Sequence, residues 1–432
     1  MCCSFRLVLT AICAASMHCT IAADRTPIHR AESLPETTPW NLEELSKPPE
    51  FEWYHGREVR VLSYKGEPFQ GKETRVHARY ATPGTLAGDP TKDKNLPAIV
   101  LVHGGGGRIY QEWLKLWASR GFAAIAMDHG RGGKTSETGP GLGMDVIYGY
   151  IDEPVTDQWP YHAVAAVIRA HSLIRSFPEV DSERTAITGI SWGGYLTCIV
   201  AGLDNRFKAA VPVYGCGFLD ENSAWLDDFK KMSHKSRAKW AQLWDPSQYV
   251  GSATMPMFFV NGGKDFCFRT DSYAKTYSLV KVKNKNIGFT PDLKHGHIFD
   301  RPKAIEIFVN HHLKGGTPLA RITALEIGVK NVTARVETRR ALVSAKLYYT
   351  TDSHIGITSY DRSKGGREWY ASRTWIKKPA TIDKNSVTAE RPPENATAWF
   401  FTVTDDREAM VSSRIVISEK EDHNNPDAGD GL

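Results

Sequence analysis

The sequence predicts an α/β protein with a mostly parallel sheet and helices on both of its faces, followed by a small all-β domain. Continuous apolar runs, such as PAIVLVHG and FAAIAMD, are typical of strands that are buried on both faces. Helical patterns alternate with these runs, as the units of a parallel sheet require. After residue 317 short alternating runs, such as ALVSAKLYYTT and TAWFFTVTD, replace the helical patterns and indicate a sandwich-like domain.

Length and composition agree with two globular domains. The chain has 432 residues, of which 41% are hydrophobic and 24% are charged. A single hydrophobic core stops growing well below this length. The net charge of +5 is spread along the chain rather than gathered into a basic stripe, which argues against a nucleic acid partner. The oligomeric state does not follow from these properties.

The first 23 residues have the pattern of an export signal. Arg6 precedes the apolar run LVLTAICAASM, and small residues follow at Ala22 and Ala23. This order predicts cleavage near Asp24 and export to a periplasm or to the medium. The run is too short to cross a membrane easily, so no stable membrane span is expected.

The rest of the chain divides into segments that differ in hydrophobic pattern and composition. Residues 24–57 have no clear period and are expected to form an irregular lead-in. Residues 58–317 form the predicted α/β domain, which opens with an antiparallel pair, EVRVLSY and TRVHARYAT. Within it, residues 220–249 carry aromatic residues at helical spacing and form either a structural cover or a lid. Residues 318–418 form the predicted sandwich-like domain, and the acidic tail 419–432 is expected to be mobile.

The elements of the α/β domain follow in order. A helix is expected in YQEWLKLWASRG, with Gly121 as its C-cap, and a longer helix over residues 160–177. Further buried strands are expected in RTAITGIS, KAAVPVYG and MPMFFVNG, and a last helix is expected over residues 302–314.

The clearest chemical signal is GISWG at residues 189–193. It lies between the strand RTAIT and the helical segment YLTCIVAGL. The glycines let a strand turn sharply into a helix and hold Ser191 with its hydroxyl exposed above the sheet. This context favours a nucleophile elbow over an ordinary turn with a capping serine.

A serine nucleophile needs a base, and the base needs an orienting acid. Asp265 follows the strand MPMFFVNGG, and two histidines follow later in LKHGHIF. The order serine, acid, histidine is the one that this topology uses. We expect His297 to be the base, because Gly296 before it leaves room for a close backbone approach, and His295 is the alternative.

A glycine-rich loop, HGGGG at residues 103–107, follows the strand PAIVLV. A tetrahedral acyl intermediate carries an oxyanion that needs preorganised N–H donors. We expect these donors to be the backbone N–H of Trp192 and that of Gly104 or Gly105. The loop lacks the lysine and hydroxyl of a phosphate-binding loop and the GxGxxG spacing of a dinucleotide site.

Three cysteines, Cys198, Cys216 and Cys267, lie outside the predicted signal. Cys216 and Cys267 both lie at carboxyl ends of strands that should be neighbours, and they either form a disulfide or remain two thiols. The sequence has no metal-binding signature, and no cofactor is expected.

Together HGGGG, DHGRGG, GISWGGY, the acid in GGKDF and the HGH loop resemble the α/β-hydrolase superfamily. More narrowly, they are similar to acetylxylan esterases, dienelactone-hydrolase-like enzymes and the catalytic domain of prolyl-oligopeptidase-type peptidases. The resemblance covers about residues 58–314. It implies Ser191 as nucleophile, Asp265 as acid and His297 as base, with a small-molecule or polysaccharide ester as substrate.

The first hypothesis is therefore an exported serine esterase that removes acyl groups, acetyl in the simplest case, from carbohydrate. Its aromatic candidates for stacking on sugar rings are Trp159, Trp192 and Trp225. The alternatives are a serine peptidase acting on short peptides and a non-catalytic glycan-binding protein. Hydrolysis of a small acetate ester distinguishes the serine esterase from the non-catalytic glycan-binding protein, since a protein that only binds has no such activity.

Overall fold

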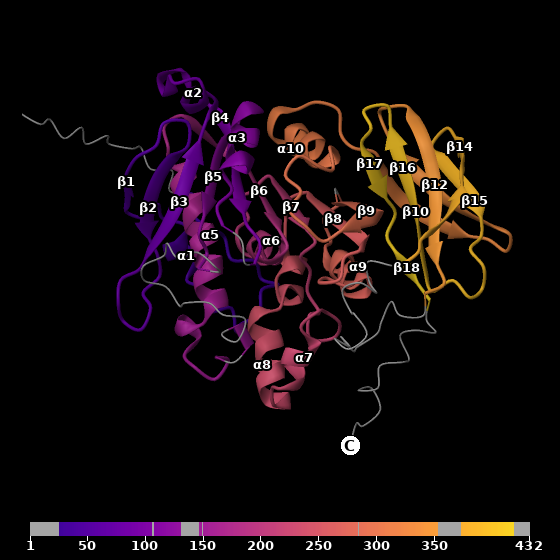
Figure 1. Ribbon diagram of the computed structural model, residues 1–432, viewed down its shortest axis with the longest axis horizontal. Helices are drawn as coiled ribbons and strands as arrows, with labels where there is room; N and C mark the ends of the chain where they lie inside the picture. Colours follow the sequence, from indigo (N-terminus) through magenta and orange to yellow (C-terminus); the bar gives the residue numbers. More distant parts are fainter. Residues whose placement is uncertain are drawn as a thin grey trace, which may run out of the picture.

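The structure of the chain is a computed structural model, in which a central sheet with its helices continues into C-terminal strands (Figure 1). It describes residues 26–105, 108–130, 147–148, 150–283, 285–352 and 373–418. The expected export signal and the acidic tail lie outside these described residues. In the part of the chain that is described, no helix is long and apolar enough to cross a membrane.

The α/β part of the sheet has the strand order β1-β2-β3-β5-β4-β6-β7-β8-β9. The pairs β2–β3 and β3–β5 are antiparallel. The strands from β5 through β4, β6, β7 and β8 to β9 all run parallel to one another. The bounds are β1 (Phe51–Trp53), β2 (Arg60–Lys65), β3 (Arg75–Ala81), β4 (Leu96–Val102), β5 (Ala123–Met127), β6 (Val180–Ile190), β7 (Ala209–Val213), β8 (Met257–Lys264) and β9 (Lys285–Lys294). This mostly parallel sheet confirms the predicted α/β class.

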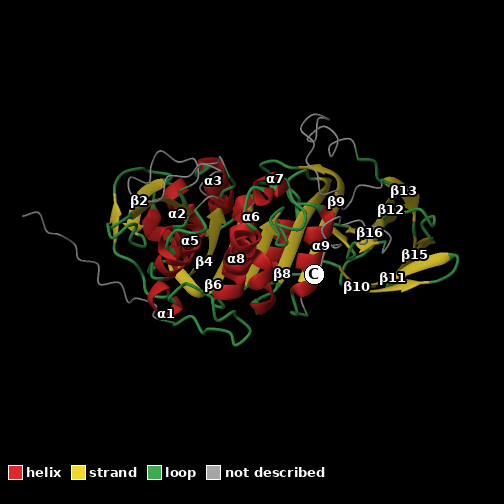
Figure 2. Ribbon diagram, turned by 90° about the horizontal axis from the view of Figure 1, so that it is seen from below, coloured by secondary structure: helices red, strands yellow, loops and turns green. Residues whose placement is uncertain are grey.

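Helices connect the parallel strands and cover the sheet (Figure 2). The helices are α1 (Leu42–Leu45), α2 (Pro83–Leu86), α3 (Gln111–Ser119), α5 (Trp159–Arg175), α6 (Trp192–Leu203), α7 (Leu226–Lys230), α8 (His234–Trp244), α9 (Thr270–Leu279) and α10 (Ala304–Lys314). Every residue of β5 and β7 is buried, although successive side chains of a strand point to opposite faces. Both faces of the sheet are therefore covered, as the continuous apolar runs predicted.

The sheet begins earlier than the sequence predicted. Phe51 pairs with Tyr64 and Trp53 with Leu62, so β1 lies inside the segment expected to be irregular. Both rings also pack against Phe177, at centroid distances of 5.5 Å and 5.7 Å. Three residues are too few to show a period of two, but two aromatic rings on one face suffice to anchor an edge strand.

The insertion at residues 220–249 contains α7 and α8 and is anchored through its tryptophans. The indole N–H of Trp240 donates to the carbonyl of Ile147 (3.0 Å), and that of Trp244 donates to Gln158 Oε1 (2.7 Å). Both indoles are fully buried. These contacts favour the structural cover over the lid.

The C-terminal strands form two layers. Their bounds are β10 (Arg321–Ile327), β11 (Asn331–Glu337), β12 (Leu342–Thr350), β13 (Ile376–Pro379), β14 (Thr381–Asp383), β15 (Ser386–Glu390), β16 (Ala398–Asp405), β17 (Met410–Ser412) and β18 (Val416–Ile417). One layer has the order β10-β11-β15-β14, and it packs against the layer that contains β12 and β13. This arrangement is sandwich-like, as predicted.

The second layer is not separate from the α/β domain. Its strands β17-β16-β12-β13 continue the central sheet beyond β9, so that the described residues form one 14-stranded sheet. At the joint Ser412 pairs with Ile287, and the backbone N–H of Phe289 donates to Ser412 Oγ (3.0 Å). The C-terminal strands thereby cover an edge of the parallel sheet that would otherwise be open to association.

Candidate active site

Ser191 occupies a strained turn between β6 and α6. Its backbone has φ 61° and ψ −121°, a conformation that few residues other than glycine adopt. A Cβ on Gly189 would lie 2.1 Å from the carbonyl oxygen of Gly193, and a Cβ on Gly193 would lie 2.0 Å from that of Val102. Both glycines are therefore required for the strand and the helix to approach, and the turn points the serine side chain toward the carboxyl edge of the sheet.

The acid and the histidine come from neighbouring strands. Lys264, the last residue of β8, pairs with Lys294, the last residue of β9. Asp265 and His295 each follow one residue later. Because β8 and β9 are parallel, the two side chains emerge side by side at the same edge of the sheet.

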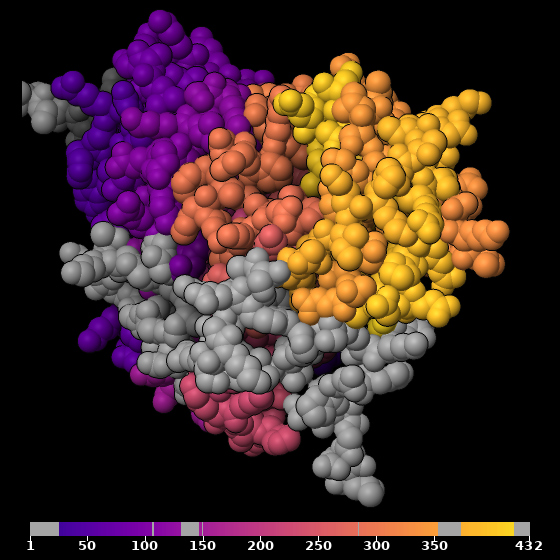
Figure 3. All heavy atoms as spheres, turned by 45° about the vertical axis from the view of Figure 1, so that its right-hand side comes forward, coloured from indigo at the N-terminus to yellow at the C-terminus, as the bar shows by residue number. Residues whose placement is uncertain are grey.

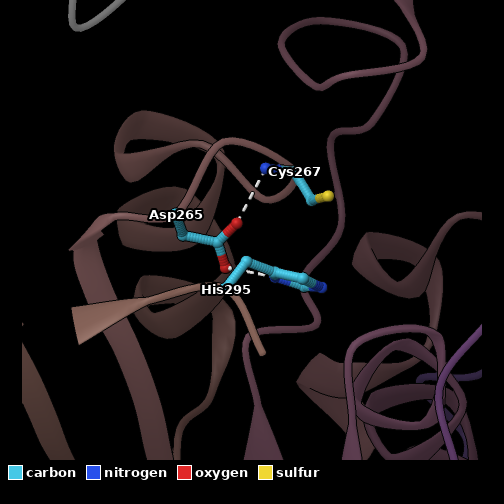
Figure 4. A group of neighbouring side chains, drawn as sticks. All are labelled: Asp265, Cys267 and His295. Atoms are coloured by element: carbon cyan, nitrogen blue, oxygen red, sulfur yellow. Dashed lines mark hydrogen bonds and ion pairs between the residues drawn. The ribbon is translucent and has the colours of Figure 1, made fainter. Parts of the chain in front are cut away.

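Three side chains are joined by hydrogen bonds at this edge. Asp265 Oδ2 lies 3.0 Å from His295 Nδ1, and His295 Nε2 lies 2.9 Å from Ser191 Oγ. Figure 4 shows the carboxylate of Asp265 directed at the imidazole ring. A carboxylate only accepts hydrogen bonds, so we assign the imidazole proton to Nδ1. Nε2 is then the acceptor for the serine hydroxyl, as a general base must be.

The other oxygen of the carboxylate is fixed by the backbone. Asp265 Oδ1 accepts hydrogen bonds from the backbone N–H groups of Cys267 (2.7 Å) and Phe268 (3.1 Å). The Asp265 side chain is fully buried. The carboxylate therefore has a single orientation, in which Oδ2 faces His295.

His297, the residue favoured from the sequence, is not in the position of the base. Its Nε2 lies 3.0 Å from the hydroxyl of Tyr110, and its ring packs against the Tyr110 ring at 4.8 Å. Burial of part of the ring, followed by the neighbouring His295, lowers the pKa of His297. A Cβ on Gly296 would meet no atom within 4 Å, so the close backbone approach that favoured His297 does not occur.

The glycine loop lies against the serine. A Cβ on Gly104 would be 3.0 Å from Ser191 Cβ and 3.6 Å from Ser191 Oγ. Trp192 is the first residue of α6, and the first N–H groups of a helix point out of its positive N-terminal end. Gly104 and Trp192 thus both lie next to Ser191, whereas Gly106 and Gly107 lie outside the described residues.

Tyr214 is a site residue that the sequence reasoning missed. Its ring lies 4.6 Å from the ring of His295, and its hydroxyl donates to the carbonyl of Lys294 (3.0 Å). Burial, followed by the charge of Asp265, raises the pKa of the Tyr214 phenol. Tyr214 therefore fixes the backbone immediately before His295. In the sequence, the signal for a site residue at this position was that Tyr214 directly follows a buried strand.

Cys216 and Cys267 are both thiols, and no disulfide joins the cysteines in the described part of the chain. The disulfide considered from the sequence is therefore not formed. The sulfur of Cys267 belongs instead to a group with Asp265 and His295 whose potential metal-ligand atoms lie within 4.8 Å of one another. In this group the carboxylate and the imidazole are engaged in the hydrogen bonds described above.

The three tryptophans considered for sugar stacking form part of the core. Trp192 packs against Trp159 at 5.6 Å and against Trp225 at 4.8 Å, and Phe268 lies 5.2 Å from Trp225. The exposed fractions of Trp159, Trp192 and Trp225 are 0%, 2% and 7%. A sugar ring needs an open aromatic face, which these side chains do not offer, and they support the turn around Ser191 instead.

A serine, a histidine and a buried aspartate joined in this order at the carboxyl edge of a parallel sheet define a serine hydrolase with the α/β-hydrolase fold. Known proteins agree with this class. A family model described as acetyl xylan esterase (AXE1) matches residues 33–230, which confirms the resemblance to acetyl xylan esterases.

Two curated relatives are an acetyl esterase and a peptidase. Acetyl esterase Axe7A of Xylanibacter ruminicola is 26% identical over 242 residues, 52% of this chain and 54% of that protein. The uncharacterized peptidase YuxL of Bacillus subtilis is 26% identical over 197 residues, 42% of this chain and 27% of that protein. The chain thus spans about half of the first relative and about a quarter of the second.

The solved structure of an acetyl xylan esterase from Paenibacillus sp. R4 superposes with a TM-score of 0.53 at 23% identity. The superposition covers 63% of this chain and 92% of that structure. This likeness supports the α/β-hydrolase fold.

Proposed function

We propose that the protein is a carboxylic ester hydrolase that removes acetyl groups from carbohydrate through Ser191, His295 and Asp265. The observation that carries this proposal is the continuous chain of hydrogen bonds, 2.9 Å from Ser191 Oγ to His295 and 3.0 Å from His295 to Asp265. The substrate class rests on the matching family model and on the acetyl esterase relative.

The first half of the reaction is acylation. Ser191 Oγ attacks the ester carbonyl while His295 Nε2 takes the serine proton, and Asp265 stabilises the charged imidazole that results. The oxyanion is held by the backbone N–H of Trp192 and by that of Gly104 or Gly105. When the intermediate collapses, the ester C–O bond breaks and His295 returns the proton to the sugar oxygen that leaves.

The second half is hydrolysis of the acyl-enzyme. His295 Nε2 takes a proton from a water molecule, whose oxygen attacks the acyl carbon on Ser191. The bond to Ser191 Oγ then breaks, the serine recovers its proton from His295, and the carboxylic acid departs. The same base serves both halves because it lies beside Ser191 Oγ throughout.

A serine peptidase is the second candidate, and the similarity to the peptidase YuxL over 197 residues favours it. The same three residues would cleave an amide, since the chemistry differs only in the leaving group that His295 protonates.

The experiment is a substrate panel with Ser191→Ala as the matched variant. We expect acetate release from acetylated xylan and acetylated monosaccharides, with a loss of roughly 10⁴-fold or more in kcat in the variant. Blocked dipeptide amides and longer acyl esters complete the panel. Acetate release that survives Ser191→Ala would refute the proposal, and faster cleavage of the amides would support the peptidase. Binding of the polysaccharide without turnover of any substrate would support the non-catalytic alternative.

We also propose that the chain is exported, on the basis of the apolar run after Arg6 and the small residues before Asp24. Expression of the full chain in a bacterial host tests this. Terminal sequencing of the exported protein should give a start near Asp24. An uncleaved chain that stays in the cytoplasm would contradict the proposal.

A further inference from the structure

We propose that the C-terminal strands hold the loop that carries Asp265, and that Trp375 is a positioning residue of the reaction. This inference rests on the proposed function, because it assigns a task within the same triad. It concerns residues 263–270, the segment from the end of β8 to the start of α9 with Asp265 in its middle.

The first contact comes from Trp375, immediately before β13. Its indole N–H donates to the carbonyl of Gly263, two residues before Asp265, over 3.3 Å. A Cβ on Gly263 would lie 2.1 Å from the indole nitrogen, so the ring sits directly on the backbone there. The indole is 9% exposed and packs between the rings of Phe289 (5.7 Å) and Phe400 (5.0 Å). A rigid ring clamped in this way restricts the backbone that it touches.

The second contact comes from Arg373 at the other end of the same segment. Its Nη1 donates to Thr270 Oγ1 over 3.1 Å, five residues after Asp265. Arg373 is 2% exposed, which is unusual for arginine and indicates a structural role. Trp375 and Arg373 therefore hold the segment 263–270 by hydrogen bonds on both sides of Asp265.

The third contact reaches the strand that carries the histidine. Ser412 of β17 is paired with Ile287 of β9, and β9 ends one residue before His295. In Figure 3 the yellow and orange atoms of the C-terminal strands lie directly against the salmon-coloured surface of the preceding part of the chain. The acid and the base thus both lie on elements that the C-terminal strands contact.

Catalysis is sensitive to this support. The hydrogen bonds of the triad span 2.9 Å and 3.0 Å, so a shift of the loop by about 1 Å breaks them, and misplacements of that size cost roughly 10²-fold in rate. Substrate binding depends less on Asp265, which is buried behind His295. Loss of the support should therefore lower kcat and leave KM nearly unchanged.

The test compares Trp375→Ala with Val387→Ala, a fully buried residue of β15 in the other C-terminal layer. Both truncations reduce stability, so activity is measured well below either melting temperature. We expect Trp375→Ala to lower kcat roughly 10- to 100-fold with KM changed less than about threefold. Val387→Ala should change kcat by less than about twofold. Trp375→Phe, which keeps an aromatic ring on Gly263, should recover most of the loss.

Thr270→Val gives a second test that does not depend on the folding of Trp375→Ala. It is nearly isosteric and removes the acceptor of Arg373, and we expect kcat to fall about 3- to 10-fold at unchanged KM. If neither variant lowers kcat more than Val387→Ala does, the inference is wrong. An inactive wild-type protein whose Ser191 also fails to react with a fluorophosphonate would instead refute the proposed function. The two failures are therefore distinguishable.

Discussion

His295→Ala is expected to lower kcat roughly 10⁴- to 10⁶-fold, the loss that follows removal of the base from a serine triad. His295 is the group within hydrogen-bond distance of Ser191 Oγ that can accept its proton, at 2.9 Å from Nε2. Alanine leaves the serine hydroxyl protonated and therefore a weak nucleophile. Catalysis that remains would come from the oxyanion donors and from substrate binding.

His297→Ala is the matched control, because it removes the same side chain two residues later in the same loop. His297 forms a hydrogen bond with Tyr110 rather than with Ser191, and we therefore expect kcat of His297→Ala to fall less than about tenfold. Steady-state kinetics on one acetyl ester, with melting temperatures to confirm folding, make the comparison. A large loss for His297→Ala and a small one for His295→Ala would show that the base had been assigned to the wrong histidine.

Asp265→Asn should lower kcat by roughly 10⁴-fold, although it changes one atom of a buried side chain. Two backbone N–H groups, those of Cys267 and Phe268, point at Oδ1. In the variant the amide oxygen is held there, since an amide NH₂ would face two donors. The NH₂ group is then turned to His295 Nδ1 and donates to it. The imidazole proton moves to Nε2, where it faces the serine hydroxyl and prevents general-base catalysis.

The control for this variant is Asp292→Asn on the neighbouring strand β9. Asp292 forms an ion pair with Lys264 over 2.9 Å and its side chain is 82% exposed, so its loss should alter kcat by less than about twofold. Rates for both variants at the same pH, together with their melting temperatures, separate the two effects. Normal turnover by Asp265→Asn would contradict the orientation that we assign to the carboxylate.

Much of the α/β domain could be predicted from local chemistry. Strands buried on both faces of a parallel sheet are continuous apolar runs, and the sequences of β4, β5 and β7 show this pattern directly. Ser191 could also be predicted from the GxSxG motif. Gly189 and Gly193 have no room for a side chain, so the motif contains the two residues that the sharp strand-to-helix turn requires.

The choice of histidine could not be made from the sequence. It depends on the register between β8 and β9, where Lys264 pairs with Lys294 across an irregularity in the ladder. A shift of two residues in this register would bring His297 rather than His295 beside Asp265, and the spacing of LKHGHIF does not encode the register. The same limit applies to the C-terminal strands, whose runs predicted a sandwich but not the pairing of Ser412 with Ile287.

Covalent capture of Ser191 tests the central claim most directly. We expect a fluorophosphonate to add once to the wild-type protein, with peptide mass spectrometry placing the adduct on Ser191. Ser191→Ala should gain no adduct, and His295→Ala should react at least about 100-fold more slowly, because the hydroxyl then has no base. A folded wild-type protein that stays unmodified, or an adduct that persists in Ser191→Ala, would contradict the assignment of the nucleophile.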